Sequence, residues 1–333
     1  MAAAAHGGGA LISRTGQPEL CFGVDLGGSK IEAIVLDGAG STRWRQRVAT
    51  PAGDYRATLA SVAWLIERAE ADTGSRAQRI GVGTPGVSTH AGVMKNSNSQ
   101  CLNGQPLEHD LATLLARPVR IANDANCLAL SEATDGAGAG AEVVFAVILG
   151  TGVGAGVVVN GRLLTGPNGL AGEWGHNPLP WSGAEELPGP ACYCGQHGCA
   201  EAWLSGPAMA RDHAERTGIT ATADAIGRLA AAGDAACEAT LRRYETRLAR
   251  ALAQVINLLD PHVVVLGGGV SQLDRLLTNV PALWGQHVFS GGAKDALKDS
   301  VRTRLVRSIH GDSSGVRGAA WLWRADEIGR AHV

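Results

Sequence analysis

The sequence predicts an α/β protein with a duplicated core, one copy in each of two lobes. Apolar runs of strand length, such as residues 20–26, alternate with stretches of helical periodicity. The order apolar strand, glycine turn, apolar strand, tight turn occurs twice, in "CFGVDLGGSKIEAIVLDGAGS" and "VVFAVILGTGVGAGVVVNGRLLTG". A recurring pattern of this kind indicates an internal duplication.

The other elements follow in order along the chain. "TRWRQRVAT" is predicted to be a polar strand, and Tyr55 to Thr73 an amphipathic helix that ends at Gly74. "RIGVGTPG" is a strand that leads into a turn, and "PVRIANDANCLALSEAT" is a strand followed by a helix. Residues 182–200 are expected to form a loop, and about 207–260 to be helical. "DPHVVVLGGGVS" predicts a buried strand with a glycine turn, and "GDSSGVRGAAWLWRA" predicts a last helix.

Size and charge narrow the class of protein. The chain has 333 residues, 45% of them hydrophobic and 18% charged, which is an ordinary globular mixture of two-domain size. The formal net charge of −2 and the scattered basic residues do not indicate a nucleic-acid or membrane partner. Residues 1–19 are Ala/Gly-rich and lack the pattern of a secretory signal, so we expect a flexible extension and a cytoplasmic protein.

Three glycine turns stand at strand ends. Asp25 precedes "LGGSK", "GTGVG" spans residues 150–154, and Gly267 to Gly269 follow a run of valines. Glycines let backbone N–H groups approach phosphate oxygens, and a carboxylate such as Asp25 can hold Mg²⁺. Taken alone, a single turn of this kind is more typical of a plain hairpin than of a phosphate site. The three together favour a nucleotide site.

Asp124 lies between a predicted strand and a predicted helix, in "NDANC". Two interpretations are open from the residues alone. Asp124 could cap the helix. It could also be a general base that takes the proton from a sugar hydroxyl during phosphoryl transfer.

The stretch from Gly172 to Gly206 holds the most specific signal. His176, Cys192, Cys194 and Cys199 form a Cys₃His set, which suits a closed tetrahedral Zn²⁺ site of structural rather than catalytic type. The chain has seven cysteines, an odd number, and three of them are concentrated here, which argues against a disulfide framework and against free surface thiols.

Two acids flank these candidate metal ligands. Glu173 precedes His176 by three residues, and Glu201 follows Cys199 by two. Carboxylates next to Asn and His side chains suit a polyhydroxyl ligand, because each sugar hydroxyl both donates and accepts. The alternative is that either Glu is a solvated surface charge.

Taken in order, "GVDLGGSK", "GTPG", "NDANC", "GTGVGAG", "GEWGH" and "CYCGQHGCAE" resemble the ROK family of repressors, open reading frames and sugar kinases. The resemblance runs from about residue 20 to 324. It implies the actin-like, hexokinase-like ATPase fold with two lobes around a central cleft. The small lobe would comprise residues 20–134, rejoined by a helix over 312–328. The large lobe would comprise 135–311 and contain the zinc-binding loop 172–201.

The resemblance also implies an activity, ATP- and Mg²⁺-dependent phosphorylation of a hexose at its 6-hydroxyl. "KNSNSQCLNGQPL", "GEWGHNPLPW" and "HGDSSGVRGAAWLW" look closest to the bacterial fructokinases of the manno(fructo)kinase type. Fructose is therefore the first expectation. Kinases of N-acetylglucosamine, glucose or mannose are the alternative. A homodimer is possible.

By this resemblance, each candidate site residue has an implied role. Asp124 matches the catalytic base. The substrate-binding positions are Gly86, Asn98, Asn123, Asp124, Glu173, His176 and Glu201. The nucleotide positions are Asp25, Gly27, Gly28, Ser29, Lys30, Thr151, Gly152, Gly267, Gly268 and Gly269. Structural zinc matches His176, Cys192, Cys194 and Cys199. Ser29 stands where the family more often has Thr, and the hydroxyl is retained.

Two rivals come from other classes. A sugar-responsive repressor needs a helix-turn-helix segment ahead of "GVDLGG", and about twenty Ala/Gly-rich residues are not expected to form one. A sugar-binding module without turnover would separate from a kinase in an activity assay.

Overall fold

The structure, a computed structural model, describes residues 20–97, 99–289 and 301–324. It divides into two compact units. The first runs to Cys127 and takes up the chain again from Ser313, and the second comprises Leu128–Asp312. The expected N-terminal extension, Asn98 and the expected helix beyond residue 324 lie outside the described residues.

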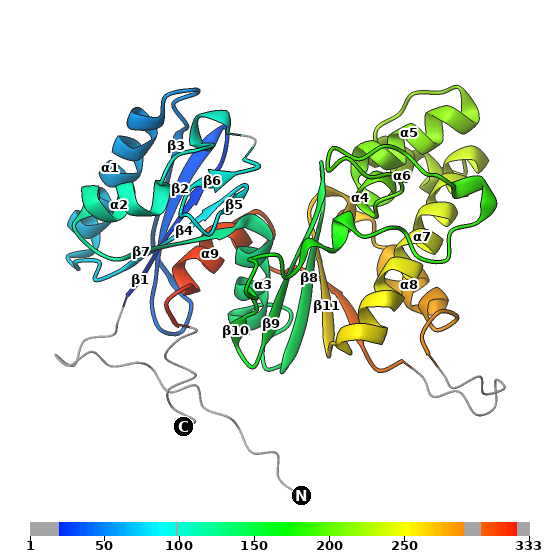
Figure 1. The fold of residues 1–333 in the computed structure, drawn as a ribbon. Coiled ribbons are helices and arrows are strands. Elements are labelled where there is room, and N and C mark those ends of the chain that lie inside the picture. Colours follow the sequence, from blue (N-terminus) through cyan, green and yellow to red (C-terminus); the bar gives the residue numbers. More distant parts are fainter. Residues whose placement is uncertain (1–19, 98, 290–300, 325–333) are drawn as a thin grey trace, which may run out of the picture. The chain divides into compact units, whose positions relative to one another are not determined.

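The first unit contains a five-stranded sheet (Figure 1). Strands β1, β2 and β3 are joined as antiparallel neighbours, and β4 and β7 continue from β1 as parallel strands. In spatial order the strands are β3 (Thr42–Ala49), β2 (Lys30–Leu36), β1 (Cys21–Leu26), β4 (Ile80–Thr84) and β7 (Val119–Asn123). A separate small hairpin pairs β5 (Val87–Ser88) with β6 (Met94–Lys95), followed by a 3₁₀ turn, η1 (Gln100–Leu102).

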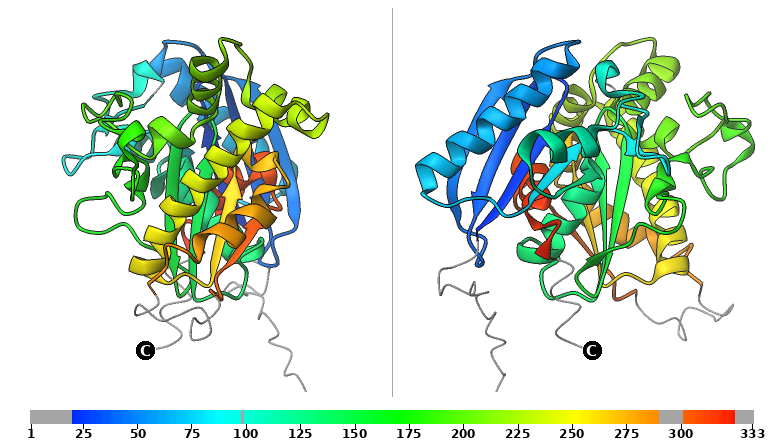
Figure 2. Two further views of the ribbon diagram at one scale, coloured as in Figure 1. Left: turned by 90° about the vertical axis from the view of Figure 1, so that its right-hand side faces the viewer. Right: turned by 60° about the vertical axis from the view of Figure 1, so that its left-hand side comes forward.

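Helix α1 (Tyr55–Thr73) packs on β2 and β3 and on helix α2 (Leu107–Leu115). The Asp54 carboxylate caps α1 by accepting the Ala57 N–H, and Gly74 ends it in the left-handed region at φ 66°. The prediction of a helix over residues 55–73 is therefore confirmed. Figure 2 shows α1 lying along the strands in its right-hand view.

Helix α9 (Ser314–Trp321) packs on β1 and β4 of the same sheet. Gly23 and Gly81 lie where the α9 backbone comes so near that a Cβ atom on either glycine would clash with it. Glycine in these strands therefore permits a close helix–sheet contact. A 3₁₀ turn, η6 (Gly311–Ser313), leads into α9. The last helix predicted from "GDSSGVRGAAWLWRA" is thus present.

The second unit repeats this arrangement of strands (Figure 1). In spatial order they are β10 (Arg162–Leu163), β9 (Val153–Val159), β8 (Val143–Leu149), β11 (Val263–Gly267) and β12 (Arg304–Arg307). The first three pair antiparallel, and β11 and β12 continue from β8 as parallel strands. The matching order and directions in both sheets confirm the duplicated core.

Helix α7 (Ala235–Leu259) buries a long apolar stripe in the largest core of the second unit. Helices α5 (Gly206–Thr217), α6 (Ala223–Ala231) and α8 (Leu276–Trp284) pack against it, as does the short α4 (Glu201–Leu204). The left-hand view of Figure 2 shows the yellow α7 and the orange α8 in front of the strands. Leu128 and Ala129 of α3 (Asp124–Asp135) belong to another cluster with β8, β9 and β11. Among the helices described, none combines the length and the apolar character that a membrane span requires.

Candidate functional site

Two candidate acids of the first unit lie at the carboxyl ends of parallel strands. Asp25 pairs in register with Gly83, and Thr84 pairs with Asn123, so the ends of β1, β4 and β7 align at one edge of the sheet. Asp124 follows at once as the first residue of α3. Ligand and catalytic groups gather at this edge in open α/β sheets. The structure therefore places Asp124 near enough to Asp25 to act on it electrostatically, a pairing that the sequence analysis did not predict.

The charge balance at this edge is unfavourable for two free carboxylates. The pKa of Asp25 is raised from 3.8 to about 6. Burial is the largest cause, and the nearby Asp124 and Glu32 carboxylates contribute to the same rise. Asp124 is exposed as a residue, but burial of its carboxyl group raises its pKa above the ordinary value, while the Ala125 N–H opposes this. A cation at Asp25 would relieve this repulsion.

The helix cap at this position comes from Asn123. Its side-chain oxygen accepts the Asn126 N–H at 2.7 Å, the contact that an N-cap residue makes at the start of a helix. Asp124 Oδ1 accepts the adjacent Ala125 N–H at 2.9 Å. The geometry therefore makes Asn123, and not Asp124, the residue that caps α3.

The first glycine turn connects β1 to β2. Gly28 and Ser29 at its tip are exposed, and the Gly27 N–H donates to the Lys30 carbonyl at 3.0 Å. Thr50 fixes the turn from β3, because its hydroxyl donates to the Gly27 carbonyl and its N–H donates to the Ser29 carbonyl. The tip backbone and the Ser29 hydroxyl remain available to a ligand.

The second glycine turn connects β8 to β9 and lies beside the third. Thr151 at its tip is exposed. Gly267 pairs with Ile148 at the end of β8, and a Cβ atom on Gly268 would lie 2.5 Å from the Leu149 carbonyl. Gly268 is also at φ 82°, a conformation that side chains disfavour. Two of the three predicted glycine turns therefore meet in the second unit.

Glu201 links the second glycine turn to the predicted metal loop. Its Oε2 accepts the Val153 N–H at 2.8 Å, and a Cβ atom on Gly152 would lie 2.7 Å from the same oxygen. Just beyond α4, the Gly206 N–H donates to the Gly150 carbonyl at 2.8 Å. This contact leaves Oε1 of Glu201 to accept from a ligand, so a solvated surface charge does not describe this residue.

Gly86 lies in the first unit at φ 87°, with its backbone against Lys95 and Ser97. A Cβ atom there would lie 2.6 Å from the Lys95 carbonyl, so glycine is required by space as well as by φ. The segment it supports runs directly to position 98. Asn98 itself lies outside the described residues.

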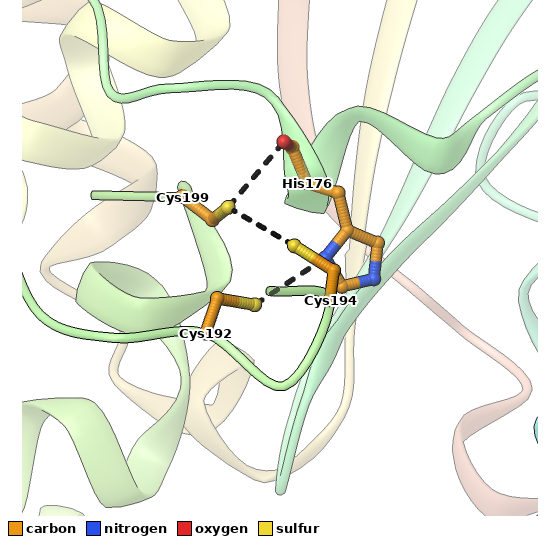
Figure 3. Close-up of side chains that lie close together, drawn as sticks. All are labelled: His176, Cys192, Cys194 and Cys199. Atoms are coloured by element: carbon orange, nitrogen blue, oxygen red, sulfur yellow. Dashed lines mark hydrogen bonds between the residues drawn. The ribbon is translucent and has the colours of Figure 1, made fainter. Parts of the chain in front are cut away.

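The four predicted metal ligands converge in the second unit (Figure 3). All four ligand atoms lie within 4.8 Å of one another. The Cys192 sulfur lies 3.5 Å from His176 Nδ1, and the Cys194 and Cys199 sulfurs lie 3.6 Å apart. Backbone bonds join the segments, since the Ala200 N–H donates to the Asn177 carbonyl and the Leu179 N–H to the Gly198 carbonyl. His176 ends the 3₁₀ turn η2 (Glu173–His176).

This donor set fits a zinc ion. A tetrahedral site with Zn–S bonds of about 2.3 Å places two sulfurs about 3.8 Å apart, close to the separations found here. Four protein ligands would complete the shell, so the site suits a structural ion. Ligation through Nδ1 would leave Nε2 of His176 as the N–H nitrogen, and Figure 3 shows that nitrogen pointing away from the sulfurs.

Tyr193 is a residue that the sequence analysis missed. Its hydroxyl lies 3.0 Å from His176 Nε2, and the two rings meet edge to face with centroids 5.0 Å apart. Although Tyr193 is 77% exposed as a residue, partial burial of its hydroxyl end raises its pKa to about 12, with the nearby Glu201 and Glu173 carboxylates as further causes. Within the described part of the chain, the Glu173 carboxylate has no hydrogen-bond partner. The position of Tyr193 between two metal ligands was the available signal.

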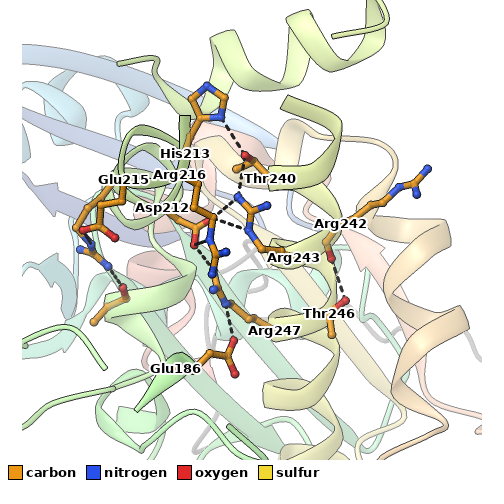
Figure 4. A network of polar contacts seen from close by, with 12 residues as sticks. Glu186, Asp212, His213, Glu215, Arg216, Thr240, Arg242, Arg243, Thr246 and Arg247 are labelled. Atoms are coloured by element: carbon orange, nitrogen blue, oxygen red, sulfur yellow. Dashed lines mark hydrogen bonds and ion pairs between the residues drawn. The ribbon is translucent and has the colours of Figure 1, made fainter. Parts of the chain in front are cut away.

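An ion network anchors the other half of the metal loop to α7 (Figure 4). Arg247 Nε donates to Glu186 at 2.9 Å and its Nη1 donates to Asp212 at 3.0 Å. Arg250 donates to both oxygens of Glu186, which lies in the 3₁₀ turn η3 (Ala184–Glu186), and to the Trp181 carbonyl. Although burial alone raises the pKa of Glu186, these two arginines hold it below its ordinary value.

Arg247 also reaches the segment that carries Glu201. Its guanidinium carbon lies 4.2 Å from the ring centroid of Trp203, two residues after Glu201 on α4. Arg247 is only 3% exposed. A buried guanidinium on an aromatic face and between two carboxylates is held in a single geometry. Arg247 therefore connects the loop, α4, α5 and α7.

The candidate residues are thus divided between the two units. The first holds the acid pair, the first glycine turn, Gly86 and Asn123. The second holds the other two glycine turns, Glu173, Glu201 and the metal ligands.

Comparison with known proteins gives one family. The model of the ROK family matches residues 21–326. An N-acetylgalactosamine kinase from Shewanella sp. (strain ANA-3) is 37% identical over 310 residues, which cover 92% of this chain and 98% of the relative. An N-acetyl-D-glucosamine kinase from Erwinia tasmaniensis is 39% identical over 306 residues, which cover 90% and 98%.

Solved structures agree with this family. A ROK hexokinase from Thermus thermophilus superimposes with a TM-score of 0.80 at 33% identity, covering 94% of this chain and 100% of that one. The fold is therefore the actin-like, hexokinase-like fold that the sequence resemblance implied.

Proposed function

The chain belongs to the ROK family, and from this premise we propose that it is an ATP-dependent sugar kinase that phosphorylates an N-acetylated hexosamine at its 6-hydroxyl. N-acetylglucosamine is the first substrate of the proposal. The sequence motifs put fructose first and N-acetylglucosamine among the alternatives. The relatives at 37–39% identity carry the names of N-acetylhexosamine kinases, and so they support the alternative over fructose.

The observation that carries the proposal is the position of Asp124. It begins a helix at the carboxyl edge of a parallel sheet, yet Asn123 makes the helix cap. Burial raises the pKa of its carboxyl group, which brings that group nearer to the pKa that a general base for a sugar hydroxyl requires. Such a base accepts the proton as the hydroxyl oxygen attacks the γ-phosphorus of ATP, and ADP leaves.

The remaining roles follow from the chemistry of each group. In the first unit, the tip of the glycine turn at Gly27, Gly28 and Ser29 binds phosphate oxygens through N–H and hydroxyl donors, beside Lys30. In the second unit, the turn at Thr151 and Gly152 binds phosphate in the same way. Gly267, Gly268 and Gly269 lie beside that turn and offer a flat backbone surface to the adenosine.

Sugar recognition is assigned to groups that accept hydrogen bonds from hydroxyls or donate hydrogen bonds to them. Glu173 and Oε1 of Glu201 fill this role in the second unit, and His176 is fixed close to them by the metal loop. Asn123 keeps its side-chain NH₂ for a ligand, since its oxygen caps α3. Gly86 and Asn98 complete the proposed set.

Two metals belong to the proposal. Asp25 would hold Mg²⁺, which when bound neutralises phosphate charge during transfer. Its fit rests on the crowded acid pair, where an added cation removes repulsion. Zinc would be held by His176, Cys192, Cys194 and Cys199, and it would order the loop that carries the sugar-binding acids.

A coupled ADP-release assay with Mg-ATP tests the proposal. It compares N-acetylglucosamine, N-acetylgalactosamine, fructose, glucose and mannose on one enzyme preparation. We expect the highest kcat/KM with N-acetylglucosamine. Fastest turnover of fructose would contradict the substrate and keep the mechanism. No turnover on any sugar, with zinc confirmed at one per chain, would contradict the kinase itself.

A further inference from the structure

The first glycine turn contains a peptide unit between two glycines, Gly27 and Gly28. Neither residue has a Cβ atom, so the backbone on both sides of this peptide can reach conformations that other residues avoid, and the peptide can rotate at low steric cost. A trans peptide unit is planar, so its C=O and its N–H point in opposite directions. Rotation by half a turn would therefore put the Gly27 carbonyl where the Gly28 N–H now points.

Thr50, the residue after β3, holds this peptide in one orientation. Its hydroxyl donates to the Gly27 carbonyl at 2.7 Å, and its N–H donates to the Ser29 carbonyl at 3.1 Å. The second bond continues the pairing of β2 with β3 one residue further, so the Thr50 backbone is held by the sheet. Because the hydroxyl binds the carbonyl side of the peptide, the Gly28 N–H points away from Thr50.

The Gly28 N–H is suited to a phosphate oxygen. In the part of the first unit that the structure describes, this N–H has no hydrogen-bond partner, and Gly28 is exposed. An ionised phosphate oxygen accepts hydrogen bonds from backbone N–H groups. A carbonyl oxygen in the same place would repel it. The orientation of one peptide therefore determines whether this side of the turn attracts or repels phosphate.

In the second glycine turn, the equivalent carbonyl is also held from outside the hairpin. Gly150 follows β8 as Gly27 follows β1, and the Gly150 carbonyl accepts the Gly206 N–H at 2.8 Å. The donor is a side-chain hydroxyl in the first turn and a backbone N–H in the second. Two different donors at equivalent positions indicate that holding this carbonyl is a requirement of the turn.

We propose that Thr50 is a positioning residue for nucleotide binding. Its hydroxyl keeps the Gly27–Gly28 peptide in the orientation that presents the Gly28 N–H to a phosphate oxygen of ATP. The inference rests on the proposed function, which assigns phosphate to this turn. Thr50 acts through the peptide, so loss of its hydroxyl should weaken nucleotide binding and leave sugar binding unchanged.

The test compares full-length wild type, Thr50→Val and Thr50→Ser. Titration calorimetry measures the Kd of the Mg²⁺ complex of the ATP analogue AMPPNP, and steady-state kinetics measure KM for ATP and for N-acetylglucosamine. Valine keeps the shape of threonine without the hydroxyl, so the Kd and the KM for ATP should rise about three- to tenfold, the effect of one lost neutral hydrogen bond. The KM for N-acetylglucosamine should stay within about twofold of wild type. Serine keeps the hydroxyl and should restore the Kd and the KM for ATP to within about twofold.

Thr73→Val is the matched control. Thr73 is half-buried like Thr50, and its hydroxyl donates to the Ala69 carbonyl at 2.6 Å at the C-terminal end of α1. The variant loses the same kind of hydrogen bond in the same unit. Its Kd and both KM values should equal those of wild type, even if its melting temperature falls.

The outcomes separate this inference from the proposed function. If wild type phosphorylates N-acetylglucosamine but Thr50→Val keeps the wild-type Kd, Thr50 does not position the turn and the kinase function stands. An equal loss of affinity in Thr50→Ser or in Thr73→Val would trace the effect to packing or stability and would also overturn the inference. A wild type that binds Mg-AMPPNP but phosphorylates no sugar would contradict the proposed kinase, and the ratio of Kd values would still decide the role of Thr50. A wild type that binds no nucleotide would contradict both.

Discussion

The glycine turn of the first unit and that of the second occupy equivalent places in the two sheets but are supported differently. The β1–β2 turn is fixed from within its own sheet by Thr50. The β8–β9 turn is fixed by Glu201, at the end of the metal loop, and by Gly206, both more than forty residues later in the chain. The duplicated scaffold therefore provides both turns, and in the second unit a segment distant in sequence supports one of them.

The acidic groups differ in the same way. The first unit has an acid pair, Asp25 and Asp124, whose pKa values are raised by burial and crowding. In the second unit, Glu186 and Asp212 are buried too, but arginines hold their pKa values below the ordinary range. Raised values suit groups that bind a cation or take a proton, and lowered values suit permanent ion pairs. The raised pKa values of the first pair agree with the chemical roles proposed for Asp25 and Asp124, and the lowered values of the second pair agree with permanent anchoring.

The largest expected effect tests the proposed role of Asp124 as the general base. Asp124→Asn should lower kcat roughly 10²- to 10⁴-fold, because the amide cannot accept the hydroxyl proton. The amide oxygen still accepts the Ala125 N–H, so the melting temperature should stay unchanged. Steady-state kinetics with N-acetylglucosamine and Mg-ATP measure the effect, and Glu173→Gln is the contrast, expected to raise KM for the sugar. A kcat within tenfold of wild type would remove Asp124 from the role of base.

A second experiment tests how much the buried ion pairs of Arg247 with Glu186 and Asp212 stabilise the fold. Arg247→Met removes a buried guanidinium from Glu186, Asp212 and the Trp203 ring, and should lower the free energy of unfolding by about 3 kcal/mol. Arg250 and Arg243 still pair with the two acids, which keeps the cost at the low end of the range for broken buried pairs.

Urea unfolding followed by circular dichroism measures this change. Arg242→Met is the matched control on the same helix, since the Arg242 side chain is 75% exposed and pairs with Glu238 four residues earlier. We expect it to cost well under about 1 kcal/mol. Equal losses of unfolding free energy in the two variants would mean that the buried ion pairs of Arg247 stabilise the fold no more than the exposed pair of Arg242.

The smallest expected effect is a change in stability with pH that the raised pKa of Asp25 should cause. The folded-state pKa of Asp25 is raised from 3.8 to about 6, so the folded protein holds this proton more tightly than the unfolded chain. The resulting stabilisation is complete below pH 3.8 and is lost as the pH rises through about 6. In Mg²⁺-free buffer, the difference in unfolding free energy between wild type and Asp25→Asn should therefore change in this window. A constant difference across it would show that Asp25 is not perturbed.

Local patterns predicted much of the fold. The α1 helix, the two strand–glycine–strand hairpins and the run of valines in β11 appear where periodicity and glycine placed them. These features depend on residues close to one another in the chain, so one sequence is enough to predict them. The four metal ligands were equally visible, since cysteines and a histidine at loop spacing have few other uses.

The substrate was harder to predict. Motifs at residues 95–107, 172–181 and 310–323 favoured fructose, whereas the relatives support an acetylated hexosamine. A hydroxyl and an acetamido group differ by one or two contacts, and those contacts depend on how a loop folds. Tyr193 stood in the sequence between two metal ligands, but only its distance to His176 drew attention to it.

By itself, the sequence determined the duplicated α/β core, the glycine turns and the Cys₃His set. Each of these features depends on residues that are neighbours in the chain or that recur at a regular spacing. Only the tertiary structure decided that Asn123 rather than Asp124 caps α3, that Glu201 supports the second glycine turn, and that Arg247 joins four segments. These contacts join atoms whose proximity depends on chain packing. Hydrogen bonds and ion pairs act over a few ångströms, so their partners are set by the folded geometry and not by spacing in the chain.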